Sequence, residues 1–540
     1  MIYRELFSEM PYGAVLSAEY LPNRCSFCFT DKAVVTCGEN GCKKVFYCNE
    51  KCRSSDQPNH TFECVAFMNQ MGEDIEEIVR LVGRLLTRRM VDNGVVHLCR
   101  NFPNNIEDRR LSDLISHEAE IEAVKLRRQR SEEVVELFSE AYSGTPLVDN
   151  LTMVKQMYCI ASINCFAVSG PVDMSTGCGV SLGTALYLNV SRFNHSCRPD
   201  LQTFFDNSCL IILYPSTVPD EMTTEVVKER VAMTISAEAL NRLTISYGFS
   251  NEFTNTCTFP LRDQRREWLN FGYHFQCNCV LCGDEMAAAL EEDAAAFECS
   301  KCGQPYLWTQ KMTNQSPIMC WRPKSATFDC RKSCRCISDH KEKARRKAYL
   351  KICDPKTNYA LLQCEWSKAV FSPASDVRPP EIVSKYRTVW ELARRFWHSA
   401  ANLRMYQLQE RMLTELSDCV MNMWETKGNI DSQILEMSLL TGELTLSSNE
   451  CRRNITLEVA LGPYAYKLAK LYEVAAQASL SIDNAVRHWA RAAKWYFFAG
   501  MIWKPYGQHS VEFVLDLEAH GSWAKAMEQW AGLQKKKLCD

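Results

Sequence analysis

Residues 25–64 read CSFCFTDKAVVTCGENGCKKVFYCNEKCRSSDQPNHTFEC, a short stretch that is dense in cysteine. Eight candidate metal ligands fall in it as four closely spaced pairs: Cys25 and Cys28, Cys37 and Cys42, Cys48 and Cys52, and His60 and Cys64. Zinc takes four thiolate or imidazole ligands in a tetrahedron, and a short loop lets one backbone turn present two of them. Eight ligands therefore indicate two zinc ions. A segment this short cannot build a useful apolar core, so zinc binding should supply most of its folding free energy.

The alternative interpretation of this stretch is a chance run of buried free cysteines, but four correctly spaced pairs in order argue against it. The order resembles the MYND finger, in which the ligand pairs interleave. The resemblance implies that one ion is held by Cys25, Cys28, Cys48 and Cys52, and the other by Cys37, Cys42, His60 and Cys64. Gln57 stands where many such fingers carry a tryptophan, which weakens the expected grip on proline-containing peptides.

Composition narrows the class of protein. The chain has 540 residues, more than one hydrophobic core usually supports, so two to four domains are expected. A net charge of −3 argues against direct nucleic-acid binding. The sequence shows neither a signal peptide nor an apolar run long enough to span a membrane, so we expect a cytoplasmic or nuclear protein. Thiols stay reduced in those compartments, and clusters among the 28 cysteines are therefore better interpreted as metal ligands than as disulfides.

Three regions differ in their hydrophobic pattern. Apolar residues recur at helical spacing from Ile75 to Leu86, and the pattern continues from Leu111 to Phe138. Short β-favouring runs follow at 201–205, 210–214 and 243–247. Beyond about His340 the chain is helical in character, and residues 457–501 form a helix pair with alanines at the contact positions. This pair resembles a tetratricopeptide-type hairpin, although an irregular helical domain fits the weak repeat equally well.

A second group of motifs lies downstream of the finger: RFNHSCRPD at 192–200, ISYGF at 245–249 and GYHFQCNCVLC at 272–282. A finger followed by a helical insert, NHSC, an ISY strand end and CxCxxC resembles the SET and MYND domain (SMYD) family of protein-lysine methyltransferases over essentially the whole chain. Cys277, Cys279 and Cys282 supply only three zinc ligands, and a closed structural site needs four. The resemblance implies that Cys197 is the fourth ligand.

The resemblance also implies a chemistry, the transfer of a methyl group from S-adenosylmethionine to a lysine of a protein substrate, histone or otherwise. An apolar, aromatic channel disfavours the charged form of the lysine, and holding both reactants in line makes the step nearly unimolecular. By resemblance, Tyr247 is the catalytic tyrosine and Tyr273 lines the lysine channel. The implied cofactor residues are Asn164, Asn194, His195 and Phe275. Peptide partners are expected at the finger or at the C-terminal helices.

The expected fold is α+β: a small-sheet SET core split by the zinc finger and a helical insert, then an all-α, tetratricopeptide-like C-terminal domain. The expected domains are a residual N-terminal SET strand (1–24), the finger (25–64), the helical insert (65–155), the SET core (156–250), the post-SET zinc segment (251–283), a cysteine-rich insertion (284–339) and the helical domain (340–540).

Some features depart from the family pattern. Family members open with a strand and a Gly-Xaa-Gly turn that approaches the cofactor, and this chain shows no such turn, so it is either a shortened product or has lost part of the methyl-donor pocket. Asp200 replaces an asparagine. The alternative function is therefore an inactive, zinc-dependent interaction scaffold. Cys299, Cys302, Cys330 and Cys334 have ribbon-like spacing and form either a fourth zinc site or a set of surplus thiols.

Overall fold

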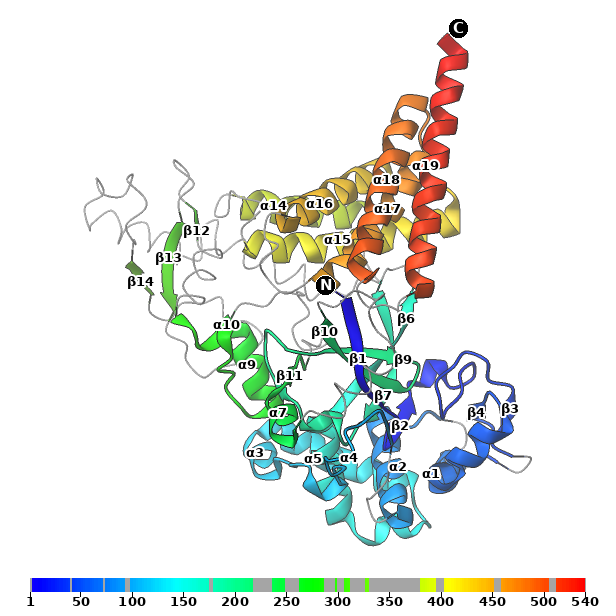
Figure 1. Ribbon diagram of the computed structural model, residues 1–540, viewed down its shortest axis with the longest axis vertical. Helices are drawn as coiled ribbons and strands as arrows, with labels where there is room; N and C mark the ends of the chain where they lie inside the picture. Colours follow the sequence, from blue (N-terminus) through cyan, green and yellow to red (C-terminus); the bar gives the residue numbers. More distant parts are fainter. Residues whose placement is uncertain are drawn as a thin grey trace.

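The computed structural model of the protein is shown in Figure 1. It describes residues 2–38, 41–70, 73–92, 98–173, 178–216, 236–247, 262–285, 297–298, 305–310, 326–329, 379–394, 403–450, 458–504 and 511–539. Helices and small sheets alternate in the first half, and the second half is helical from residue 379 onward where it is described, which confirms the expected α+β fold. No helix in these ranges is long and apolar enough to cross a membrane.

The strands are short and form several small sheets. They are β1 (Ile2–Glu9), β2 (Gly13–Leu16), β3 (Val35–Thr36), β4 (Phe46–Tyr47), β5 (Cys99–Arg100), β6 (Cys165–Asp173), β7 (Cys178–Leu186), β8 (Asn194–His195), β9 (Gln202–Asp206), β10 (Cys209–Ser216), β11 (Thr244–Ile245), β12 (Phe297–Glu298), β13 (Pro305–Gln310) and β14 (Ala326–Asp329). The sheet orders are β5-β1-β10-β9, β2-β7-β6, β11-β8, β3-β4 and β12-β13-β14. The first two sheets join the N-terminal strands to strands more than 150 residues further along the chain.

The α-helices are α1 (Glu50–Asn69), α2 (Glu77–Asp92), α3 (Glu118–Ala123), α4 (Lys125–Ala141), α5 (Leu151–Asn164), α7 (Ala237–Arg242), α9 (Arg262–Tyr273), α10 (Val280–Gly283), α14 (Pro379–Ala393), α15 (Leu403–Lys427), α16 (Ser432–Glu450), α17 (Glu458–Gln477), α18 (Ile482–Trp503) and α19 (Val511–Cys539). Single 3₁₀ turns connect several of them, including η2 (Leu111–Asp113) and η4 (Val190–Arg192).

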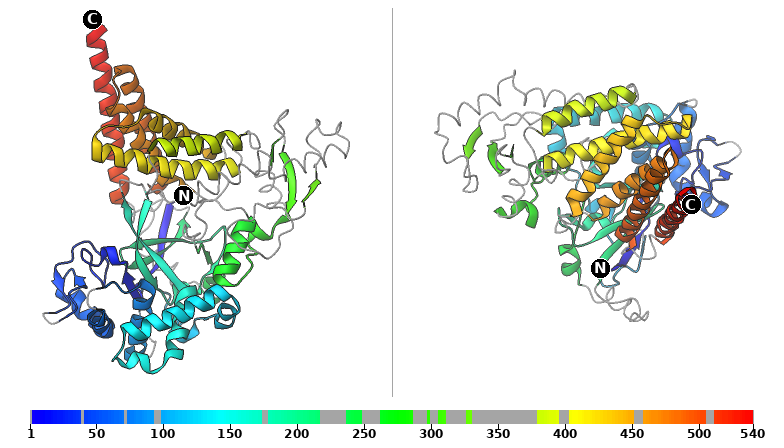
Figure 2. Two further views of the ribbon diagram at one scale, coloured as in Figure 1. Left: turned by 180° about the vertical axis from the view of Figure 1, so that it is seen from behind. Right: turned by 90° about the horizontal axis from the view of Figure 1, so that it is seen from above.

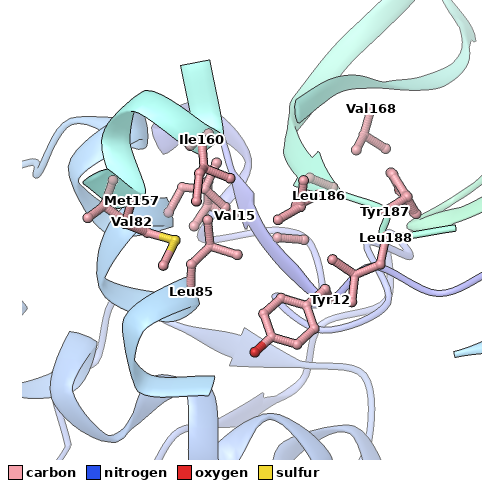
Figure 3. Close-up of a cluster of buried hydrophobic side chains, with 14 of the residues drawn as sticks. Tyr12, Val15, Val82, Leu85, Met157, Ile160, Val168, Leu186, Tyr187 and Leu188 are labelled. Carbon is pink, nitrogen blue, oxygen red and sulfur yellow. The ribbon is translucent and has the colours of Figure 1, made fainter. Parts of the chain in front are cut away.

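One buried core joins the finger, the helical insert and the small sheets. Figure 3 shows its centre, where Val15 of β2 lies among Val82 and Leu85 of α2 and Met157 of α5. The strand β7 passes so close to β2 that a Cβ on Gly183 would lie 2.0 Å from the carbonyl oxygen of Val15. Glycine is therefore required at this position. The N-terminal strands are thus built into the same core as α2, α5 and β7.

The C-terminal helices have a second core of their own, built from residues of α14 to α19. Tyr466 and Tyr472 of α17 and Trp495 and Tyr496 of α18 are completely or almost completely buried in it. In Figures 1 and 2 this helical block lies on one side of the sheets, and α1 to α5 lie on the other. The expected helix pair at 457–501 is confirmed as α17 and α18. Its likeness to tetratricopeptide repeats stays a prediction.

The structure corrects one sequence prediction and leaves others untested. The helical pattern expected from Leu111 onward is wrong at its start, where a 3₁₀ turn is followed by extended backbone at Leu114. The carboxylate of Asp113 accepts a hydrogen bond from the Arg110 backbone N–H at 2.8 Å, and this local bond favours the turn. A small sheet, β12-β13-β14, lies in the expected cysteine-rich insertion, but Cys299, Cys302, Cys330 and Cys334 fall outside the described residues. The domain boundaries stay predictions.

Candidate active site and metal centres

The finger brings its eight predicted ligands together as two interleaved groups of four. One group is Cys25, Cys28, Cys48 and Cys52, and the other is Cys37, Cys42, His60 and Cys64. Within each group the ligand atoms all lie within 4.8 Å of one another. Thiolates and one imidazole at this spacing are the ligands that zinc prefers in closed structural sites. The geometry therefore suits two zinc ions with the interleaved pairing.

Local structure presents these ligands. Helix α1 begins after Asn49, whose side-chain oxygen accepts a hydrogen bond from the backbone N–H of Cys52 at 2.9 Å. The cap places Cys52 in the first turn of the helix. His60 and Cys64 lie one turn apart on the same helix, so both side chains point to one side. Cys37 and Cys42 are separated by four residues in the sequence, yet their sulfur atoms lie only 3.6 Å apart.

A buried charge network lies behind the histidine ligand. His60 Nδ1 is 2.8 Å from Glu63 Oε2, so the ring can present its other nitrogen to a metal. Arg84 of α2 donates to the same Glu63 oxygen at 2.7 Å and reaches Asp56 with two further bonds of 3.0 and 3.1 Å. Tyr47 donates to Asp56 at 3.0 Å, and all these side chains are buried. The finger is therefore tied to the helical insert by paired charges.

A third group of four cysteines joins distant segments. Cys197 follows strand β8, and its sulfur lies 3.8 Å from that of Cys277 and 3.6 Å from that of Cys282. Cys279 completes the group. Arg266 of α9 donates to the carbonyl oxygens of Cys277 and Cys282 at 3.1 and 2.8 Å, which fixes the ligand loop. These four thiols also suit a closed zinc site, which would attach the post-SET segment to the core.

Next to this third group is a cavity of about 920 Å³. Its lining includes all six residues predicted from the sequence as catalytic or cofactor-binding, namely Asn164, Asn194, His195, Tyr247, Tyr273 and Phe275. They come from the end of α5, from β8, from the residues after β11 and from the end of α9. The fold thus brings together residues that lie up to 111 positions apart in the sequence. Their individual roles stay predictions.

Three of these side chains form an aromatic wall. The rings of Tyr247 and Tyr273 are 4.8 Å apart, and Phe275 meets Tyr247 edge to face at 6.3 Å. The hydroxyl of Tyr247 donates a hydrogen bond to the carbonyl oxygen of Phe193 at 3.0 Å. Burial raises the pKa of Tyr247, and burial together with Tyr247 raises the pKa of Tyr273 to about 12. Both phenols are therefore neutral at physiological pH.

His195 connects the aromatic wall to the third metal group. Its Nδ1 accepts a hydrogen bond from the backbone N–H of Tyr247 at 3.1 Å, and its Nε2 lies 3.3 Å from the sulfur of Cys197. Burial lowers the pKa of His195 to about 4, so the ring is neutral. Because both ring nitrogens have partners within the protein, His195 can meet a cofactor only through its backbone or its ring face.

The other two predicted cofactor residues differ in their surroundings. Asn164 donates from Nδ2 to the carbonyl oxygens of Ile160 at 2.9 Å and Ile115 at 3.1 Å, so its side-chain oxygen is the group it can offer to a ligand. Asn194 is exposed at the cavity, on the short strand that pairs with β11. A ligand in the cavity would therefore meet one fixed acceptor and one accessible amide.

The cavity lining also contains residues that the sequence analysis did not single out. Arg109 and His117 come from the loop between β5 and α3, and Arg192 comes from turn η4. His117 has a left-handed backbone, with φ of 50°, and its ring lies 5.4 Å from that of His274. Arginine and histidine in a loop carry no periodic or spacing signal. Only the folded arrangement places them at the site.

Behind the cavity, Glu9 holds turn η4 in place. Its carboxylate is completely buried and accepts hydrogen bonds from the backbone N–H groups of Asn189 and Val190, each at 2.9 Å. Burial raises the pKa of Glu9 to about 7, even though those two bonds favour the charged form. The side chain of Asn189 in turn accepts a bond from the backbone N–H of Arg109 at 3.0 Å. This set of bonds supports two of the cavity arginines.

Comparison with known proteins agrees with the geometry of the finger. A family model described as the MYND finger matches residues 25–64. The chain is 25% identical over 311 residues to the N-lysine methyltransferase SMYD2 of Homo sapiens. The aligned region covers 56% of this chain and 58% of that protein. It is 24% identical over 295 residues to the histone-lysine N-methyltransferase Smyd1 of Mus musculus, covering 53% and 54%.

A third relative, SET domain-containing protein 14 of Caenorhabditis elegans, is 25% identical over 331 residues, covering 60% of this chain and 65% of that protein. The chain thus spans less than two thirds of the length of each of these relatives. Together with the finger match, they confirm the resemblance to the SET and MYND domain family of lysine methyltransferases.

Proposed function

We propose that this protein is an S-adenosylmethionine-dependent protein-lysine N-methyltransferase that works in the cavity described above. The observation that carries the proposal is the convergence of Tyr247, Tyr273 and Phe275 with Asn164, Asn194 and His195 on one cavity. These residues belong to separate sequence motifs that lie up to 111 positions apart in the chain. A set of unrelated packing residues would have no reason to share one opening.

The residues present fit the methyl donor. A cavity of about 920 Å³ is within the size range of small-molecule sites. Phe275 supplies an aromatic ring for stacking on a purine, and the oxygen of Asn164 supplies an acceptor for an amine. Bound there, S-adenosylmethionine would supply an electrophilic methyl group on a positively charged sulfur. The neutral lysine amine is itself the nucleophile that would take this methyl group as the C–S bond breaks, so the protein has to align and desolvate the lysine.

Tyr247 and Tyr273 are suited to that task. The Tyr247 hydroxyl uses its proton in the bond to the Phe193 carbonyl, so its oxygen lone pairs remain available to orient a substrate N–H. The neutral aromatic walls disfavour a charged ammonium and thereby lower the pKa of a lysine in the channel. The lysine loses its proton to solvent before it reacts. Alignment then supplies most of the rate enhancement.

The first test is a calorimetric titration of the zinc-replete full chain with S-adenosylhomocysteine, followed by a methylation assay on a mixture of histone and non-histone proteins. We expect one binding event per chain and transfer of labelled methyl groups to lysine. A fully metallated, folded chain that binds no adenosyl ligand would overturn the enzyme proposal. That result would favour the second candidate, an interaction scaffold built on the zinc finger.

A further inference from the structure

Apart from its two metal-ligand cysteines, Cys277 and Cys279, the cavity of the proposed methyltransferase has an excess of positive charge. Among the described residues that line it, Arg109, Arg192 and Arg198 carry positive charges and Asp200 alone carries a carboxylate. Asp200 is already engaged, because Thr244 donates to it from the backbone at 3.0 Å and from the hydroxyl at 2.7 Å. A cavity with this balance of charges suits a ligand with an anionic group.

Two of the three arginines are poorly placed to bind that group. The guanidinium of Arg192 donates to the carbonyl oxygen of Glu107 at 2.9 Å and to the side chain of Asn189 at 3.2 Å, and it lies over the ring of Phe102. Arg198 is exposed, so water screens its charge. Arg192 is thus held by the wall, and Arg198 lies at the solvent side.

Arg109 differs from both. It is half-buried, and its guanidinium donates one hydrogen bond, from Nη2 to the carbonyl oxygen of Asp113 at 3.0 Å. Among the described residues, no carboxylate lies within ion-pair distance of it. Burial and the nearby positive charge of Arg192 lower its pKa, and the more distant carboxylate of Asp113 offsets this only in part. An arginine in this situation would gain from an anion, because the anion offsets desolvation and like-charge repulsion together.

The position of Arg109 within the cavity narrows the choice of anion. Arg109 and Tyr247 line the same cavity, and they lie near enough for each to influence the pKa of the other. S-adenosylmethionine carries a carboxylate only a few bonds from its reacting sulfur. An acidic residue of a peptide substrate would lie outside the lysine channel, further from Tyr247.

We propose that Arg109 binds the α-carboxylate of the methyl donor and thereby anchors the amino-acid end of the cofactor next to Tyr247. The inference rests on the proposed function. Its chemistry is a charge-assisted hydrogen bond between guanidinium and carboxylate, which a lysine reproduces only in part because it lacks the planar fork. A carboxylate from the peptide substrate would use the same chemistry, and the experiment separates the two sources.

The test compares two ligands on the full, zinc-replete chain. S-adenosylhomocysteine has the carboxylate, whereas 5′-methylthioadenosine lacks the whole amino-acid end. We expect Arg109→Gln to weaken binding of S-adenosylhomocysteine by about 10- to 100-fold and to leave the affinity for 5′-methylthioadenosine within about twofold. Arg109→Lys should fall between wild type and Arg109→Gln. The thermal midpoint of each variant checks that the fold is intact.

Arg110→Gln is the matched control. Arg110 is the next residue and pairs with Glu107 at 3.3 Å, but it does not line the cavity. Its loss should leave both affinities unchanged. Equal weakening of the two ligands by Arg109→Gln, or no weakening of either, would overturn the inference while leaving the proposed function intact. If Arg109→Gln raised the KM for an acidic peptide and left the cofactor affinity unchanged, Arg109 would bind the substrate instead. That result would also overturn the inference. Failure of the wild type to bind either ligand would overturn both proposals.

Discussion

The hydroxyl group of Tyr247 donates a hydrogen bond to the carbonyl oxygen of Phe193, and this bond determines what the side chain presents to the cavity. The phenol oxygen faces a substrate as an acceptor, while the ring packs against Tyr273. The half-buried position makes the residue part of the wall as well as a candidate catalytic group. Chemistry and packing can therefore be separated by removing the oxygen alone.

Tyr247→Phe removes the oxygen and keeps the ring. We expect turnover to fall by roughly 100-fold, because the substrate amine loses the acceptor that orients it. The thermal midpoint should change little, since the ring still fills its place and only the bond to Phe193 is lost. Single-turnover rates with saturating cofactor measure the first effect and a melting curve the second. An unchanged rate would show that another residue orients the amine.

Glu9 gives a prediction about pH. Its pKa is about 7 in the folded protein, compared with an ordinary value of 4.5 for a glutamate in water, because burial disfavours the charged form. Between these values the folded state keeps a proton that the unfolded state has released, so stability falls as pH rises from about 4.5 to about 7. The size of this effect is about 3 kcal/mol.

Glu9→Gln should remove this dependence. The variant loses one acceptor at every pH, because an amide has a single oxygen for the two backbone N–H groups of Asn189 and Val190. Its stability relative to wild type should nevertheless rise steadily from pH 5 to pH 8 and level off above that. Urea unfolding at each pH measures the difference. Glu19→Gln, at an exposed site, is the control and should show no such trend.

The site residues differ in how far the sequence could predict them. The eight finger ligands and Cys277, Cys279 and Cys282 follow from spacing, since short loops let one backbone turn present two ligands to one zinc ion. Cys197 lies 80 residues before Cys277 and was implied only by the family resemblance. Tyr247, Tyr273 and Phe275 were accessible only through resemblance to a family. Arg109 and Glu9 could not be found by either route. Their surroundings depend on long-range packing, and an isolated arginine or glutamate in a sequence looks like any surface residue.

At the scale of elements, helices α1 and α2 pack together through charge as well as apolar contact. Arg80 and Arg84 lie one turn apart on α2 and both are buried, with Arg84 bonded to Glu63 and Asp56 of α1. Arg80 donates to the carbonyl oxygen of Ile75 at 3.2 Å. The contact therefore joins the zinc finger to the helical insert through a network that water does not reach.

Arg84→Met should destabilise the finger and insert by about 3–5 kcal/mol, because the buried Asp56 would lose its arginine partner and the buried Glu63 would keep only His60 and Arg80. Chemical unfolding in zinc-containing buffer measures the change. The control is Arg53→Met on the exposed side of α1, where Arg53 pairs with Glu50 in water. That variant should lose no more than about 1 kcal/mol. Similar decreases in the free energy of unfolding for the two variants would show that the buried ion pairs contribute no more stability than an exposed pair.

The helices show where sequence patterns succeed and fail at this scale. Ile78, Val79, Val82 and Leu85 indicate the apolar face of α2 correctly, because burial repeats with the helical period. The same pattern gives no sign that Arg80 and Arg84 are buried, since charged positions are normally assigned to the solvent face. The helical pattern predicted from Leu111 is wrong only at its start, where a side-chain bond to the backbone favours a 3₁₀ turn; α3 and α4 confirm the rest.

At the scale of the whole molecule, the two largest hydrophobic cores of the described residues predict two separate responses to metal removal. The finger and the Cys197 group need their ligands joined by an ion, whereas α17 and α18 pack on each other in a core that contains no described metal group.

Treatment with a zinc chelator should therefore remove amide protection from residues 25–64 and from the segment around Cys277. Protection in α17 and α18 should stay close to that of the untreated protein. Hydrogen exchange followed by peptide mass spectrometry measures both regions in one experiment. Uniform loss along the chain would show that the C-terminal helices depend on the metal sites after all.

The pairing of β1 with β10 has a consequence for how the protein is made. The eight finger ligands lie within residues 25–64, so the finger can bind zinc soon after that segment has left the ribosome. Strand β1 has to wait, because its partner residues Leu210–Ser216 are synthesised much later. The cavity and the adjacent Cys197 group form later still, after Cys282 has emerged from the ribosome. The end of β1 can pair early with β5, but the rest of the strand lacks its partner until β10 is made. During that interval its backbone edge is open to pairing with other chains.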